Sequence, residues 1–323
     1  MRYALYLPPL GELADPGVLG ELAEKAEAAG FDGVFLRDHV VRPSAGLAVC
    51  DPWIALSAIA LCTTRITIGT WTTPLARRRP QEVARQAVAL DRLSGGRFVL
   101  GAGDADGGGE SGEGDGRDGT GGADSRDRAG GLDGADGTGD AHGGDGSGGD
   151  GRPYAAGARG DGPAQPPAGS TADLPDVPRP RDAVLDESLD VICRLWSGER
   201  TTHAGPHFRI EDVRSLPRPV QRPRIPIWVA ARPGDTAPLR RAARFDGLCP
   251  ETSPEGLRGM LAEIERRRGG LDGFDVAVGG PPGADPAPYR DAGATWWVMR
   301  FPDTVGARDV SAALDRFDAR PSS

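Results

Sequence analysis

Short apolar segments rich in β-branched residues alternate with amphipathic segments along most of this chain. A short apolar run that ends at Gly or Pro is typical of a buried strand, and a longer stretch with apolar residues every three or four positions is typical of a helix. Strict alternation of the two predicts a parallel sheet covered by helices. The predicted strands are Tyr3–Leu7, Gly33–Leu36, Ile66–Thr70, Arg97–Gly101, Ile225–Ala230, Gly247–Cys249, Phe274–Val278 and Thr295–Phe301.

A predicted helix follows each of these strands. The first helix ends at Gly30, and the second begins at Asp51-Pro52, where proline suits the first helical position. The predicted helices are Pro16–Ala29, Asp51–Thr63, Pro80–Leu93, Arg181–Trp196, Thr236–Phe245, Ser253–Arg268, Pro286–Ala292 and Val310–Phe317. The segment His203–Val213 lies outside the pattern and predicts a small hairpin or loop.

Eight strand–helix units predict a closed (β/α)8 barrel, the TIM barrel, which typically has about 250 residues. The competing fold is an open doubly wound sheet, which carries a glycine fingerprint after its first strand. Here the first predicted strand is followed by Pro8-Pro9-Leu10-Gly11, so that fingerprint is absent. The sequence therefore favours the TIM barrel.

A long Gly/Asp-rich segment interrupts this pattern after the fourth strand. Residues 104–175 are one-third glycine and contain almost no aliphatic side chains, so they bury too little apolar surface to offset the entropy of ordering. A calcium-binding β-roll is the alternative, but its repeat needs a regularly placed aliphatic residue, which is missing. We therefore expect a disordered insertion at 104–175 between a first part of the barrel, 1–103, and a second part, 176–323.

The insertion also accounts for the acidic charge of the chain. It holds 15 acidic residues and five arginines, whereas the remainder carries 33 basic and 32 acidic residues. A near-neutral remainder indicates neither a nucleic-acid partner nor a membrane surface. The N-terminus lacks a signal pattern, and the four cysteines are far apart, which favours reduced thiols over disulfides or a zinc site. We expect a cytoplasmic protein without a metal.

Chemistry in a TIM barrel gathers at the carboxyl ends of the strands. In this sequence those positions are Pro8, Pro9, Asp38, His39, Thr70, Thr72, Thr73, Gly101, Gly103, Ala231, Arg232, Glu251, Gly279, Gly280 and Arg300. His39 is the only histidine among them, and it is the candidate to move a proton or to bond a cofactor carbonyl. A structural histidine packed against Asp38 is the alternative.

Other strand-end residues suit an anionic group. Backbone N–H groups of Gly279 and Gly280 can cradle a phosphate, although an ordinary strand-to-helix turn explains them as well. Arg232 can pair with a phosphate or lie on the surface. We interpret 77–79, three arginines, mainly as solvated charge. Trp296 and Trp297 point to opposite faces of the last strand, so at most one of them lines the barrel interior.

Several segments together resemble the luciferase-like monooxygenase family. They are AEAAGFDGVFLRDH (26–39), the long and specific segment from Asp51 to Gly103, LDESLDVICRLWSGE (185–199) and LPRPVQRPRIPIWVAARP (216–233), with GATWWVMRF (293–301) less specific. The resemblance implies a barrel that binds FMN or the deazaflavin coenzyme F420 at its carboxyl-end face. It implies hydride transfer to a small organic substrate or oxygenation of that substrate. It also suggests a homo-oligomer.

The resemblance carries roles to individual residues. It implies that His39 faces the cofactor and is the catalytic residue, and its neighbour Asp38 favours F420 over FMN. Thr70 is implied to lie beside the cofactor ring, and Gly103 to lie where the fourth strand meets it. The remaining cofactor contacts are expected at Ala231, Arg232, Gly279 and Gly280.

The sequence departs from the family after Leu-Gly-x-Gly, where members continue with a short acidic or aromatic segment that shapes the pocket. The low-complexity insertion replaces that segment here. Two alternatives to a working oxidoreductase therefore stay open: a catalytically impaired cofactor-binding protein, and an unrelated phosphate-binding barrel enzyme such as an isomerase or aldolase. The sole lysine, Lys25, lies in the first predicted helix, which argues against a Schiff-base mechanism.

Overall fold

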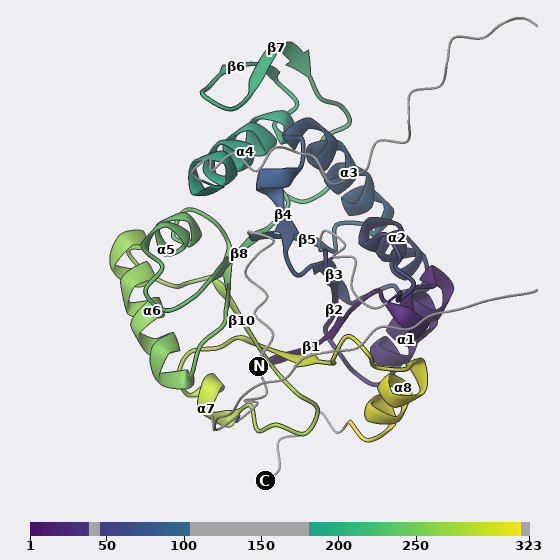
Figure 1. Cartoon of the computed structure of the whole chain (residues 1–323). Helices are drawn as coiled ribbons and strands as arrows, with labels where there is room; N and C mark the ends of the chain where they lie inside the picture. Colours follow the sequence, from purple (N-terminus) through teal and green to yellow (C-terminus); the bar gives the residue numbers. More distant parts are fainter. Residues whose placement is uncertain (39–45, 104–180, 318–323) are drawn as a thin grey trace, which may run out of the picture. The chain divides into compact units, whose positions relative to one another are not determined.

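The computed structural model describes residues 1–38, 46–103 and 181–317, all of which belong to one compact unit. In this part of the chain, eight parallel strands close into a barrel (Figure 1). They are β1 (Arg2–Leu7), β2 (Gly33–Leu36), β3 (Thr67–Thr70), β5 (Phe98–Gly103), β8 (Ile227–Ala231), β9 (Gly247–Pro250), β10 (Asp275–Gly280) and β11 (Trp296–Arg300). The prediction of a TIM barrel is confirmed.

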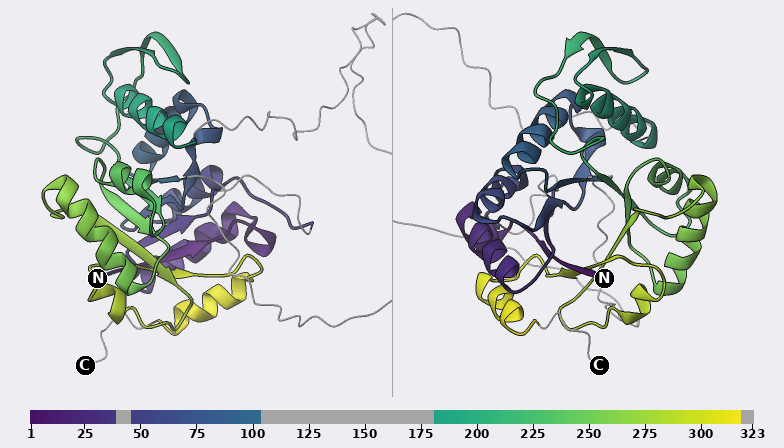
Figure 2. Two further views of the ribbon diagram at one scale, coloured as in Figure 1. Left: turned by 60° about the vertical axis from the view of Figure 1, so that its left-hand side comes forward. Right: turned by 180° about the vertical axis from the view of Figure 1, so that it is seen from behind.

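Helices surround the barrel, as both views of Figure 2 show. They are α1 (Pro16–Ala28), α2 (Pro52–Cys62), α3 (Pro80–Leu93), α4 (Arg181–Trp196), α5 (Thr236–Ala242), α6 (Pro254–Arg268), α7 (Ala287–Arg290) and α8 (Ala307–Asp315). Side chains of Asp15, Asp51 and Ser253 accept hydrogen bonds from the first-turn N–H groups of α1, α2 and α6. Proline follows each of these caps, so the helix starts are set locally by the sequence.

Parallel pairing runs in sequence order around the barrel, and β1 closes it by pairing with β11. Tyr6 lies opposite Arg300 across this last junction. The short strand β4 (Thr73–Pro74) pairs with the end of β5, with Thr73 opposite Ala102. This pairing brings the segment after β3 across the carboxyl end of β5.

Two apolar clusters form the core. The larger lies between the barrel and its helices, and the smaller fills the barrel interior with Ala4, Tyr6, Phe35, Val99, Trp228, Cys249, Ala277, Trp296 and Val298. The rings of Trp228 and Trp296 lie 5.4 Å apart, and those of Phe35 and Trp228 lie 5.1 Å apart. Trp296 thus lines the interior, while Trp297 belongs to the outer cluster, as strand alternation predicts.

A two-stranded hairpin follows α4, as the sequence predicts. It consists of β6 (Arg200–Ala204) and β7 (Arg209–Arg214), which pair antiparallel. The buried carboxylate of Glu187 on α4 accepts hydrogen bonds from the backbone N–H groups of His207 and Phe208 and contacts His203 Nε2 at 2.8 Å. One side chain therefore fixes the hairpin to the helix.

Across the described ranges, no helix combines the length and the apolar character needed to cross a membrane.

Candidate functional site

Strand alternation determines which side chains reach the barrel mouth at the carboxyl ends of the strands. Trp296 and Val298 of β11 lie in the interior cluster, and because alternate residues share a face, Arg300 continues this inward series. The same step of two from interior residues of β2, β8, β9 and β10 leads to Arg37, Arg232, Glu251 and Gly279. An aromatic interior is therefore followed by a charged layer at the mouth.

Two arginines of this layer share one carboxylate. Arg232 Nε donates to Glu251 Oε2 at 3.4 Å, and Arg300 Nη1 lies 3.6 Å from Glu251 Oε1. The guanidinium carbon of Arg300 is 5.4 Å from the centre of the Tyr6 ring. The predicted contact Arg232 therefore lies at the mouth, where it is bound by Glu251, whereas Ala231 belongs to the outer apolar cluster.

Tyr6 lies at the centre of these charges. Burial raises the pKa of its phenol to about 12, and the positive charges of Arg37 and Arg300 oppose this rise. The phenol is consequently protonated at neutral pH and available as a hydrogen-bond donor. Arg37 forms an ion pair with Asp303, which follows β11, while its Nε is buried without a hydrogen-bond partner among the described residues.

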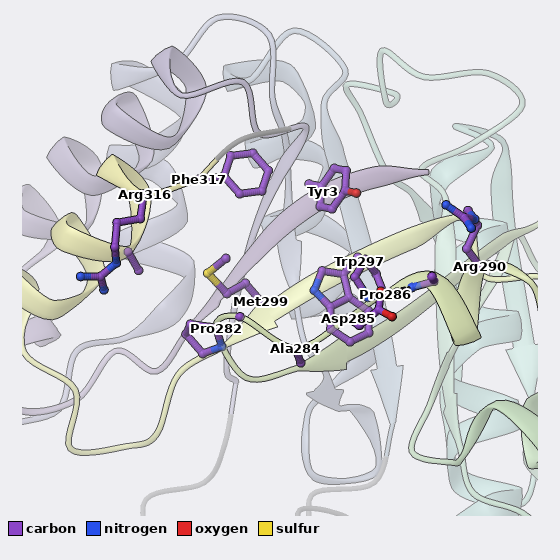
Figure 3. A pocket seen from close by; sticks show the side chains of 13 residues that line it. Tyr3, Pro282, Ala284, Asp285, Pro286, Arg290, Trp297, Met299, Arg316 and Phe317 are labelled. Atoms are coloured by element: carbon purple, nitrogen blue, oxygen red, sulfur yellow. Dashed lines mark hydrogen bonds between the residues drawn. The ribbon is translucent and has the colours of Figure 1, made fainter. Parts of the chain in front are cut away.

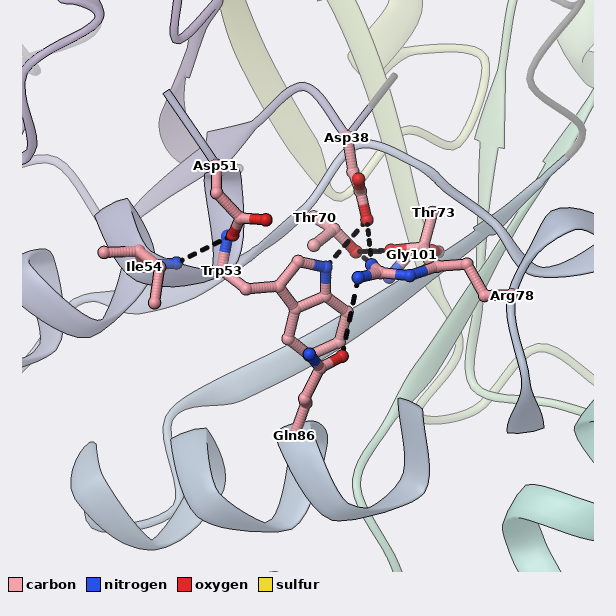
Figure 4. Close-up of polar contacts among 9 residues, drawn as sticks. All are labelled: Asp38, Asp51, Trp53, Ile54, Thr70, Thr73, Arg78, Gln86 and Gly101. Atoms are coloured by element: carbon pink, nitrogen blue, oxygen red, sulfur yellow. Dashed lines mark hydrogen bonds and ion pairs between the residues drawn. The ribbon is translucent and has the colours of Figure 1, made fainter. Parts of the chain in front are cut away.

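Asp38 faces the helical layer and not the barrel axis (Figure 4). Its Oδ2 accepts hydrogen bonds from Trp53 Nε1 of α2 at 2.8 Å and from Arg78 Nη1 at 2.9 Å. Burial raises the pKa of the Asp38 carboxyl, while Arg78 and hydrogen bonds from Trp53 and Thr73 oppose the rise. The interpretation of 77–79 as solvated charge is wrong for Arg78, whose partner is this carboxylate.

The ends of β3 and β5 are joined by hydroxyl groups. Thr73 Oγ1 lies 2.9 Å from Thr70 Oγ1, and Thr70 Oγ1 accepts from the N–H of Gly101 at 3.2 Å. A Cβ on Gly101 would lie 2.0 Å from the Thr70 carbonyl oxygen, and one on Gly103 would lie 2.4 Å from Thr72 Oγ1. Both glycines therefore allow close packing of neighbouring segments: Thr70 packs against Gly101, and Thr72 packs against Gly103.

Gly279 and Gly280 lie at the end of β10 but face different neighbours. A Cβ on Gly279 would lie 2.4 Å from Arg300 Cδ, whereas one on Gly280 would lie 2.5 Å from the Trp297 ring. Gly279 therefore leaves space for the aliphatic part of Arg300 inside the mouth. Gly280 leaves space for Trp297 on the outer face.

The predicted catalytic residue, His39, lies outside the described residues, as does the insertion predicted at 104–175. Asp38, which precedes His39, is the last described residue before the gap at 39–45. Within the described ranges, no group of three or more His, Cys, Asp and Glu side chains could hold a metal ion.

A cavity of about 790 Å³ lies outside the barrel, beside the segment that follows the carboxyl end of β10 (Figure 3). Trp297 and Met299 of β11 and Tyr3 of β1 line its floor, and residues next to α7 and at the end of α8 line its sides. The four-residue α7 is too short to cover this part of the outer face. The cavity therefore reflects a thin helical layer, and it borders the predicted contact Gly280 through Trp297.

Sequence reasoning missed three participants in the mouth: Tyr6, Arg37 and Arg78. Tyr6 and Arg37 were predictable, because each lies two positions after an interior residue, Ala4 of β1 and Phe35 of β2, and alternate strand residues share a face. The partner of Arg78 had none, since Asp38 lies 40 residues earlier in the chain.

Comparisons with known proteins agree with this architecture. The model of the luciferase-like monooxygenase family matches residues 7–128 and 160–290. The F420-dependent glucose-6-phosphate dehydrogenase of Nakamurella multipartita is 27% identical over 275 residues, which cover 81% of this chain and 62% of that relative. The 4-hydroxyprotoasukamycin monooxygenase of Streptomyces nodosus subsp. asukaensis is 39% identical over 102 residues, covering 30% of this chain and 26% of its own length.

Solved structures share the fold at low sequence identity. An F420-dependent secondary alcohol dehydrogenase in complex with an F420-acetone adduct has a TM-score of 0.64 at 14% identity, covering 97% of this chain and 96% of its own. Monooxygenase RslO1 from Streptomyces bottropensis has a TM-score of 0.64 at 18% identity, covering 98% and 97%. The family model matches segments on both sides of the insertion, and the chain therefore belongs to the luciferase-like monooxygenase family.

Proposed function

We propose that this protein is an oxidoreductase that uses F420 or FMN to transfer hydride to, or to oxygenate, a small organic substrate. The family match over both parts of the barrel carries the proposal. The chain spans 62% of the length of the first dehydrogenase relative, so the activity of that relative is a guide to reaction class and not to substrate. F420 is the preferred cofactor because similar curated proteins include several named as F420-dependent.

The chemistry of the mouth fits either cofactor. Both cofactors combine a planar ring system with phosphate groups, and the mouth offers aromatic rings beside guanidinium groups. Trp71 lies 6.4 Å from Tyr6 and 5.8 Å from Phe35, between ring centres, which gives an aromatic surface for a planar ligand. Arg232 and Arg300 supply forked donors that suit phosphate oxygens. When bound, the cofactor would supply two-electron chemistry.

The residues of the chain would act by positioning and by proton transfer. The carboxylate of Asp38, which precedes His39 in the sequence, is held by Trp53 and Arg78. His39 is proposed as the catalytic residue, with Thr70, Gly103, Arg232 and Gly279 as cofactor contacts. The other predicted contacts, Asp38, Ala231 and Gly280, are not proposed, because their side chains or Cβ positions face the helical layer. A cytoplasmic location and a homo-oligomeric state belong to the same proposal.

Equilibrium titration with each cofactor tests the proposal. FMN and F420 are added separately to the purified protein, and their absorbance and fluorescence are followed together with quenching of tryptophan fluorescence. We expect dissociation constants in the micromolar range or below for at least one of them. If neither binds in that range, the proposed function is wrong. A His39→Gln variant should keep cofactor binding and lose turnover.

A cofactor-binding protein without turnover is the second candidate. The observation that favours it is the insertion at 104–175, which occupies the place of a pocket-forming segment of the family. The reduced cofactor distinguishes the two candidates. With oxygen excluded, an oxidoreductase should oxidise bound reduced F420 or FMN when a suitable acceptor from a panel of ketones, aldehydes and enones is added. A binding protein should leave the reduced cofactor unchanged.

A further inference from the structure

Arg300 occupies an unusual position for a surface charge. It follows Trp296 and Val298 on the inward face of β11, and it lies opposite Tyr6 of β1 across the barrel closure. Its guanidinium lies above the Tyr6 ring, with the carbon 5.4 Å from the ring centre. The Tyr6 side chain is only 6% exposed. The buried Tyr6 ring therefore supports the guanidinium group of Arg300 and keeps it at the barrel mouth.

Gly279 is what allows this placement. Any side chain at position 279 would begin 2.4 Å from Arg300 Cδ and 2.9 Å from Arg300 Cγ. Contacts that short are not tolerated, so the aliphatic part of Arg300 occupies the space that a Cβ would fill. The arginine is therefore packed into the rim of the barrel along its aliphatic part and keeps its charged end at the mouth.

The guanidinium groups of Arg232 and Arg300 have few partners. In the described part of the chain, Glu251 is the only carboxylate within 4 Å of either guanidinium group, and its contacts with them are long, at 3.4 and 3.6 Å. Asp235 accepts a hydrogen bond from the backbone N–H of Arg232 at 3.0 Å. By contrast, Arg241 Nε lies 2.7 Å from Asp186 in a tight ion pair elsewhere in the barrel. Arg37 is already paired with Asp303. Two guanidinium groups thus share one carboxylate loosely, and this leaves N–H donors of both for another acceptor.

We propose that Arg300 and Arg232 form an oxyanion-binding site at the barrel mouth, which takes a carboxylate or phosphate group of a small molecule. Guanidinium groups bind such oxyanions through paired N–H donors. Glu251 holds the two arginines near each other and competes with the ligand for them. The site consists of Arg300 at the end of β11 and of Arg232 and Glu251, which directly follow β8 and β9. Only its occupation by the cofactor's phosphate rests on the proposed function.

Anion binding to the cofactor-free protein tests this site. Inorganic phosphate and acetate are titrated by calorimetry at low ionic strength. Arg300→Gln and Arg232→Gln should each weaken phosphate binding about tenfold, the loss of one charge-assisted contact. Arg209→Gln on the hairpin removes the same charge far from the mouth and should leave binding unchanged. If Arg300→Gln binds phosphate as the wild type does, the proposal is wrong.

Glu251→Gln provides a test of opposite sign. Removing the competing carboxylate while keeping its size should tighten phosphate binding, by several-fold, because both guanidinium groups lose their only charged partner there. This variant does not depend on whether the arginine variants fold. Weaker or unchanged binding in Glu251→Gln would contradict the competition on which the site is based.

A second set of titrations identifies the natural occupant. Phosphate binding is measured again in the presence of saturating FMN or F420. A loss of phosphate affinity supports the site and assigns it to the phosphate of the cofactor, whereas an unchanged affinity supports the site and assigns it to an anionic substrate. If neither cofactor binds, the proposed function fails, while the phosphate titrations alone still decide the anion site.

Discussion

Glu187 offers the sharpest test of how the hairpin is attached to the barrel. Its carboxylate is 8% exposed and contacts three groups of the hairpin: His203 Nε2 at 2.8 Å, the N–H of His207 at 3.0 Å and the N–H of Phe208 at 2.8 Å. We expect Glu187→Gln to lower the free energy of unfolding. The amide keeps one acceptor oxygen and places an NH2 group against a donor.

The magnitude follows from the number of contacts that are lost. A hydrogen bond to a charged group contributes about 1.5–3 kcal/mol. Glutamine can still accept from two of the three donors with its single oxygen, so the loss is close to that of one such bond. We therefore expect the substitution to lower the free energy of unfolding by about 2 kcal/mol at neutral pH.

The pH dependence has a definite sign. Burial raises the pKa of Glu187, but the contact with His203 and the hydrogen bonds from Phe208 and His207 together lower it below its usual value. A lowered carboxyl pKa contributes stability above the ordinary value of about 4.3, and this contribution is lost as pH falls through the folded-state pKa. The difference between wild type and Glu187→Gln should therefore shrink below about pH 4.

Urea unfolding followed by circular dichroism gives the free energies, with midpoints and slopes compared at pH 7.5 and at about pH 3, below the ordinary carboxyl pKa. Glu211→Gln on the same hairpin is the matched control, since Glu211 is exposed and pairs only with Arg209 at the surface. Its effect should stay below about 1 kcal/mol. The reasoning is refuted if Glu187→Gln is no more destabilising than this control at neutral pH.

Two further substitutions test the packing of the barrel. At the end of the barrel opposite the mouth, Arg97 donates to the carbonyl oxygens of Ala60, Thr63, Ile66 and Ser94. Arg97→Lys should therefore lower the free energy of unfolding in urea by about 2 kcal/mol and leave cofactor affinity unchanged. A change in cofactor affinity without a loss of stability would contradict this. A Cβ on Gly247 would lie 2.4 Å from Trp228 and 2.8 Å from the backbone oxygen of Asp275. Gly247→Ala should therefore destabilise by at least about 1–3 kcal/mol, and a stable variant with wild-type tryptophan fluorescence would disprove the close packing.

The order of strands and helices was predictable because both have short-range periodicity in this sequence. The bounds of β2 and α4 agree with the predicted Gly33–Leu36 and Arg181–Trp196. The fifth predicted strand begins two residues late, at Ile227, because Pro226 has no N–H to donate to the sheet. The last helix begins early, at Ala307, whose N–H donates to the distant Glu12 side chain. That contact has no signal in the local sequence.

The mouth was predictable in position but only partly in its partners. Strand ends identified Glu251 and Arg300 as residues of the mouth, because position along a strand determines which end of the barrel a residue reaches. The pairing of Arg78 with Asp38 depends on how the segment before α3 lies against the end of β2. Such a contact is set by tertiary packing, and a single sequence gives no register between segments that are not adjacent in the sheet.

Gly279 shows how the structure changes the interpretation of a motif. As part of a phosphate cradle, Gly279 and Gly280 would both serve through their backbone N–H groups, so Gly279→Ala and Gly280→Ala should weaken cofactor binding alike. In the structure, a Cβ on Gly279 would collide with the Arg300 side chain, whereas a Cβ on Gly280 would collide with the Trp297 ring on the outer face. We therefore expect Gly279→Ala to displace Arg300 and to weaken phosphate binding about as much as Arg300→Gln does. Gly280→Ala should act on stability through Trp297 and leave phosphate affinity within about twofold of wild type. If the two variants lose phosphate affinity equally, the phosphate-cradle interpretation is correct and Gly279 has no special role in placing Arg300.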